Sequence, residues 1–166
     1  MKFETFMFNL ENKIIPMAQS LLLSHSSHLP TAFIYQKNGI EKIADFTDLF
    51  SMEDKEVIYK VFKNFLEESN TVAYVLVTEA YITKVPKNIS DKEIEEILHS
   101  GISKQKREEI LVFQYDFRHG DVRKSGTINY TFKNNSGNIV IDYDNPIISS
   151  NTKDENSFSR ASSLLD

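Results

Sequence analysis

The run from Thr71 to Ile82, TVAYVLVTEAYI, constrains the fold of this chain more than any other feature of the sequence. It is the most apolar and most β-branched run in the chain. A strand of this composition is covered by other side chains on both faces. We therefore predict that it forms the central strand of a sheet, around which the other elements are arranged.

Two amphipathic helices are predicted before this strand. The first carries apolar residues at spacings of three and four, and Pro16 should kink or divide it. The second begins with Ser51 as its N-cap and an acid, Asp54, three residues later. The apolar residues of the two stripes are Phe3, Phe6, Met7, Leu10, Ile14, Met17 and Leu21 in the first, and Val57, Ile58, Val61, Phe62, Phe65 and Leu66 in the second.

The remaining apolar segments predict further strands. Residues 31–35 and 40–46 flank the turn dipeptide Asn38-Gly39 and should form a hairpin, with Ile43 on the core face. Strands are also predicted over residues 109–117, 127–132 and 139–143, the last at an edge of the sheet. Residues 85–106 are polar and charged and should hold one short helix, starting at the capping signature Ser90–Glu93.

This order of elements predicts the α+β class. We expect a mostly antiparallel sheet of about five to six strands, with two main helices packed on one face. Residues 1–148 should form a single domain, and residues 149–166, rich in serine and asparagine, a polar C-terminal tail.

Charge and composition narrow the classes of function. The net charge of −5 argues against nucleic acid as a partner, because neutralising phosphates requires a positive surface. No apolar run is long enough to span a membrane, and Glu4, Glu11 and Lys13 interrupt the N-terminal segment before it could act as a signal peptide. We therefore expect a cytoplasmic protein with no membrane partner.

Motifs for metals and cofactors are missing from the sequence. There is no cysteine, and the five glycines are too scattered for a phosphate-binding loop. The four histidines are His25, His28, His99 and His119. They lack the spacing of a metal site and are interpreted as solvated loop residues, so we expect neither a metal nor a cofactor.

Charged residues beside the strongest strands are the best candidates for a site. If the strands that carry them are neighbours, Glu79 could form a bidentate pair with Arg107, partly shielded by Tyr81. One hypothesis makes this pair the wall of a polar pocket. The other makes it a structural clamp that ties the polar segment to the sheet. The candidate ligand-binding residues are Glu79, Tyr81, Arg107, Glu109, His28 and Thr31.

Three short motifs are similar to those of a family of small bacterial α+β proteins. They are HLPT at residues 28–31, EAY at residues 79–81 and REEIL at residues 107–111, where relatives resemble HxPT, EAW and RxExL. The chain differs by carrying Tyr81 in place of tryptophan and by a polar insertion before Arg107. The resemblance implies a shared α+β domain. The family has no established activity, so the resemblance implies no substrate or mechanism.

Three functions remain open at this point. The leading hypothesis is a non-enzymatic binding or regulatory module of a bacterial or phage-related protein, with a protein partner. The alternative is a small-ligand binder or metal-independent enzyme, which requires Glu79, Arg107 and His28 to converge on one pocket. A third hypothesis is a homodimer formed through the edge strand near residues 139–143.

Overall fold

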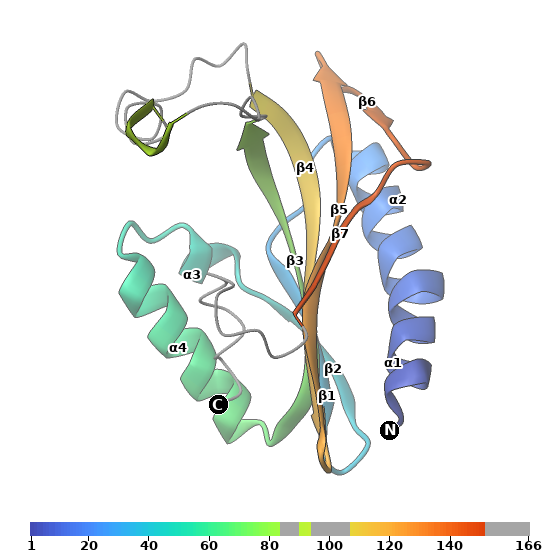
Figure 1. The fold of residues 1–166 in the computed structure, drawn as a ribbon, viewed down its shortest axis with the longest axis vertical. Helices are drawn as coiled ribbons and strands as arrows, with labels where there is room; N and C mark the ends of the chain where they lie inside the picture. Colours follow the sequence, from blue (N-terminus) through green and yellow to red (C-terminus); the bar gives the residue numbers. More distant parts are fainter. Residues whose placement is uncertain (84–89, 94–106, 152–166) are drawn as a thin grey trace.

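The computed structural model describes residues 1–83, 90–93 and 107–151, and Figure 1 shows the arrangement of the elements. In chain order the elements are α1 (Phe3–Asn9), the π-helical turn η1 (Leu10–Ile14), α2 (Ile15–His25), β1 (Thr31–Gln36), β2 (Glu41–Asp45), α3 (Thr47–Phe50), α4 (Lys55–Glu68), β3 (Thr71–Thr83), β4 (Arg107–His119), β5 (Val122–Asn135), β6 (Asn138–Ile141) and β7 (Ile147–Asn151). The predicted α+β class is confirmed.

The strands form one antiparallel sheet in the order β2-β1-β3-β4-β5-β6, with β7 also paired to β5. The long strands β3 and β4 occupy its middle, which confirms the predicted central strand. The outer edge of β5 is shared between two short strands. Its C-terminal part pairs with β6 and its middle pairs with β7.

The two main helices lie on opposite faces of the sheet, so the prediction that both pack on one face is wrong. Alternate residues of a strand point to opposite faces. On β3, Val75 and Val77 belong to the core under α1, η1 and α2, whereas Tyr74 and Leu76 belong to the core under α4. Figure 1 shows the N-terminal helical segment and α4 on either side of the sheet.

The turn η1 changes which residues of the N-terminal helical segment face the sheet. The N–H of Ile15 donates to the C=O of Leu10, five residues back, and the next residue, Pro16, has no N–H to donate. This wide turn shifts the apolar stripe by one position. Ala18 and Leu22 are therefore fully buried, whereas the predicted core residues Met17 and Leu21 are 40% and 41% exposed.

Two further predictions need correction. The helix α4 is capped by Asp54, whose carboxylate accepts hydrogen bonds from the N–H groups of Glu56 and Val57, and it begins after Ser51 rather than at it. The hairpin of β1 and β2 forms around Asn38-Gly39 as predicted. Ile43, however, is 66% exposed, because β2 is the edge strand of the sheet.

The predicted boundaries around the polar segments are only partly described. Of the short helix predicted from Ser90, residues 91–93 are helical, and the remainder lies outside the described residues. The predicted tail from residue 149 overlaps β7, which pairs Ile147–Asn151 with β5. Residues 152–166 lie outside the described part of the chain. In the helices of the described residues, no segment is both long and apolar enough to cross a membrane.

Candidate functional site

The strands β4 and β5 separate at one end of the sheet. Their ladder runs from His119 paired with Val122 to Glu109 paired with Phe132, where it stops. Beyond this point β4 stays paired with β3 as far as Arg107, and β5 stays paired with β6 as far as Asn135. Figure 1 shows the two strands diverging toward this end. The ends of β4 and β5 therefore form the two walls of a wedge.

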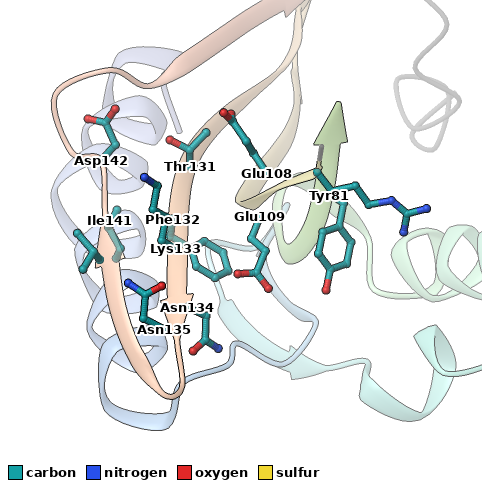
Figure 2. Close-up of a pocket in the computed structure, with 12 residues that line it drawn as sticks. Tyr81, Glu108, Glu109, Thr131, Phe132, Lys133, Asn134, Asn135, Ile141 and Asp142 are labelled. Carbon is teal, nitrogen blue, oxygen red and sulfur yellow. The ribbon is translucent and has the colours of Figure 1, made fainter. Parts of the chain in front are cut away.

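This wedge contains a pocket of about 790 Å³, which we call the notch (Figure 2). Its walls come from the ends of β3 and β4 on one side and from β5, β6 and the residue after β6 on the other. The twelve lining residues are Tyr81, Arg107, Glu108, Glu109, Thr131, Phe132, Lys133, Asn134, Asn135, Val140, Ile141 and Asp142.

One row of side chains crosses the notch at its inner end. Tyr81 lies opposite Glu109 on the neighbouring strand, and Glu109 lies opposite Phe132 on the next. These three residues share the sheet face that α2 covers elsewhere, and Figure 2 shows their side chains on the same side of the strands. Phe132 is buried, whereas Tyr81 is 64% exposed. The inner end of the notch thus combines an aromatic surface with a carboxylate.

The charges that line the notch are mixed, with an excess of acid. Arg107 and Lys133 are basic, and Glu108, Glu109 and Asp142 are acidic. The field of Glu109 reaches beyond the notch, since it adds to burial in raising the pKa of Glu79. A positively charged group would therefore be favoured at the inner end of the notch.

The structure brings together three of the six predicted site residues. Tyr81, Arg107 and Glu109 all line the notch. Glu79, His28 and Thr31 do not contribute to it. Glu79 lies two residues before Tyr81 on β3, farther from the strand end. His28 and Thr31 lie where β1 begins beside β3.

The predicted pair of Glu79 and Arg107 is not formed, although β3 and β4 are neighbours as expected. The register places Glu79 opposite Leu111 and Arg107 opposite Thr83. The two residues are thus four positions apart along the strands, or about 13 Å. No ion pair joins them in the part of the chain that the structure describes. The clamp hypothesis is wrong in this form.

Glu79 instead holds the loop that leads into β1. Its carboxylate accepts a hydrogen bond from the backbone N–H of His28. Burial raises the pKa of the Glu79 carboxyl, and burial lowers the pKa of the His28 imidazole. Thr31 donates its hydroxyl to the C=O of Leu29 within the same loop. These contacts join two of the sequence motifs, HLPT and EAY, through a structural link.

The residues of the outer wall were missed by the sequence reasoning. Lys133, Asn134 and Asn135 end β5, and Val140 and Asp142 lie in or just after β6. Their sequence, with its NNSGN turn, indicates a hairpin and nothing more. Only the register of β5 against β4, which follows from the tight turn at Gly120, shows that this hairpin faces Arg107.

The described residues contain no cluster of three or more His, Asp or Glu side chains suited to a metal ion. Comparison of the chain with family models, with curated proteins and with solved structures found no match.

Proposed function

We propose that this chain is a non-enzymatic binding module and that the notch receives a polypeptide segment of a partner protein. One observation carries the proposal: the β4–β5 ladder stops at Glu109 and Phe132, and the two strand ends enclose a pocket of about 790 Å³. Sheet strands that end without their neighbour offer backbone groups as well as side chains to a partner.

The openness of the notch favours a polypeptide over a small molecule. Small-molecule sites are typically concave, enclosed and mostly apolar. Seven of the twelve lining residues are exposed, and charged or amide side chains dominate the outer wall. A polypeptide segment can occupy an open site of this kind because its own backbone supplies polar groups along its length.

The alternative of a small-ligand binder or enzyme built on Glu79 and Arg107 has less support. It requires Glu79, Arg107 and His28 to share one pocket. Arg107 lines the notch, whereas Glu79 and His28 bond to each other outside it. A carboxylate already engaged by a backbone N–H, and separated from the guanidinium, is poorly placed to act with it.

A selection experiment tests the proposal. A displayed library of random linear peptides would be selected on the wild-type protein, and the enriched peptides measured against two variants. Lys133→Trp places an indole in the notch, and Lys124→Trp makes the same change on an exposed lysine at the other end of β5. We expect Lys133→Trp to weaken binding by about tenfold or more and Lys124→Trp to leave it unchanged.

Failure to enrich any peptide, or equal loss of binding in both variants, would contradict the proposed function. Light scattering on the unliganded protein supplies the necessary control. The homodimer through the strand near residues 139–143 remains a prediction, and it would place a second copy beside the notch. A monomeric mass would remove that occupant.

A further inference from the structure

The backbone of β5 has a defined hydrogen-bonding direction at the notch. In an antiparallel ladder the residues of one strand alternate, so that a residue directs both its N–H and its C=O to one neighbour, and the next residue directs both to the other. The N–H of Asp142 donates to the C=O of Thr131, so Thr131 faces the β6 side. Phe132 and Asn134 therefore face the β4 side.

The same rule fixes the direction of the opposite wall. Phe132 and Glu109 form the last pair of the β4–β5 ladder and face each other. Two residues earlier on β4, Arg107 must also direct its N–H and C=O toward β5. Arg107 and Asn134 would form the next pair of this ladder, and in the described part of the chain that pair is absent.

The notch thus presents two sets of backbone groups that point into it from opposite walls. Backbone N–H and C=O groups form hydrogen bonds almost without exception, with protein or with water. An extended polypeptide has the matching groups at the matching spacing, and adding it as a strand is a recurrent mode of peptide recognition.

The charge around the notch selects among extended segments. The lining holds three acidic and two basic side chains, and Glu79 adds a further carboxylate close to Glu109. Lys133 and Arg107 are exposed at the outer part of the notch, whereas Glu109 is half-buried at its inner end. A strand residue that reaches Tyr81 and Glu109 would meet an aromatic ring and a carboxylate, a surface suited to a lysine or arginine side chain.

We infer that the occupant of the notch is an extended, basic polypeptide segment that pairs as an added strand with the backbone of Asn134 and Arg107. This inference rests on the proposed function and specifies its partner class. Alternate residues of the segment direct their side chains toward Tyr81 and Glu109. The remaining residues direct theirs toward the opposite face of the sheet.

The peptides enriched from the displayed library supply the probe. Each would be synthesised with a single N-methyl group, moved one residue at a time, because N-methylation removes one N–H donor and keeps the side chain. We expect affinity to fall about tenfold, which corresponds to about 1.4 kcal/mol, at positions where the N–H bonds to the notch, because the backbone acceptor on the wall then loses its partner. Those positions should recur with the period of a strand.

A pair of charge variants tests the second half of the inference. Glu109→Gln removes the carboxylate at the inner end of the notch, and Glu53→Gln makes the same change on an exposed residue just before α4. We expect the enriched peptides to be rich in lysine and arginine. Glu109→Gln should weaken their binding several-fold, and Glu53→Gln should leave it unchanged.

The outcomes separate this inference from the proposed function. Suppose that the enriched peptides lose affinity for Lys133→Trp. If they then tolerate N-methylation at every position, or respond equally to Glu109→Gln and Glu53→Gln, the inference of an added basic strand is wrong and the proposed binding function stands. If no peptide depends on Lys133→Trp, the notch is not a binding site and both fail.

Discussion

The two ends of the β4–β5 ladder differ in what lies beneath them. At the closed end, Tyr115 and Phe117 pack against Phe3 and Phe6 of α1, and the strands are joined by a tight turn at Gly120. At the notch, Arg107 and Asn134 are exposed, and no apolar pair joins the two strands there. Toward the notch the ladder ends at Phe132, which is the last buried residue of β5.

The largest effect should come from the aromatic cluster at the closed end. Phe6 is fully buried and contacts the rings of Phe3, Tyr35, Tyr115 and Phe117. We expect Phe6→Ala to lower the free energy of unfolding by about 3–5 kcal/mol, as measured by urea denaturation.

A matched control lies two residues along the same helix. Phe8 is 60% exposed, and Phe8→Ala should change the free energy of unfolding by less than about 0.5 kcal/mol. Equal losses in the two variants would mean that the aromatic cluster does not hold the closed end together.

A smaller effect is expected at Gly126, in the middle of the ladder. A Cβ atom there would lie 2.5 Å from the backbone oxygen of Ser149 on β7 and 2.7 Å from the hydroxyl oxygen of Tyr115 on β4. We expect Gly126→Ala to cost about 1–3 kcal/mol, because either β7 or the Tyr115 ring must move. Adding Tyr115→Phe should recover part of that loss in the same denaturation assay, and a fully additive loss would place the strain on β7 alone.

The link between Glu79 and His28 predicts a pH dependence beside the notch. Because the pKa of Glu79 is raised above 4.5 in the folded chain, the unfolded chain loses this proton first, and stability falls as the pH rises through 4.5 toward the folded pKa. Glu79→Gln keeps an oxygen that can accept the N–H of His28. This variant should therefore flatten the dependence of stability on pH in this range. The free energy of unfolding should change by less than about 1 kcal/mol, because the Glu79 carboxylate is only partly shielded from solvent.

The sign of the slope identifies the group. The pKa of His28 is lowered from 6.5, so His28 makes stability fall as the pH drops through 6.5 toward the folded value. Thermal melts across this range separate the two residues. A Glu79→Gln profile that matches the wild type at every pH would show that Glu79 is not linked to folding.

The smallest effect on stability is expected inside the notch itself. Tyr81 is 64% exposed, so Tyr81→Ala should alter the free energy of unfolding by less than about 0.5 kcal/mol. Peptide affinity should fall in the same variant, because the aromatic wall is lost. A large loss of stability would instead make the notch part of the core and remove the contrast between the two ends.

Much of the fold was predictable because local patterns decide it. The run from Thr71 to Ile82 is mostly apolar and β-branched, which favours a central strand, and Asn38-Gly39 fixes the β1–β2 hairpin by turn geometry. The buried residues of α2 were predicted one position out of phase. The cause is the π-helical turn η1, in which the N–H of Ile15 donates to the C=O of Leu10, and this turn leaves no mark in hydrophobic spacing.

The site was less accessible to sequence reasoning than the fold. Glu79 and Arg107 were correctly assigned to neighbouring strands, but the register between them depends on the apolar rows of the whole ladder. In the observed register Glu79 and Arg107 are four positions apart along the strands, which is too far for a salt bridge. The notch forms because Arg107 and Asn134 do not pair across β4 and β5. No local residue pattern predicts that this pair is absent.

The division of the outer edge of β5 has a consequence for how molecules of this chain meet in solution. A long, flat strand at the edge of a sheet is a template on which other chains aggregate. Here the fourteen residues of β5 are bordered by strands of four and five residues, with Pro146 between them. At this edge of the sheet a neighbouring molecule therefore finds only two short strands interrupted by Pro146, and this arrangement discourages growth of the sheet from one copy to the next.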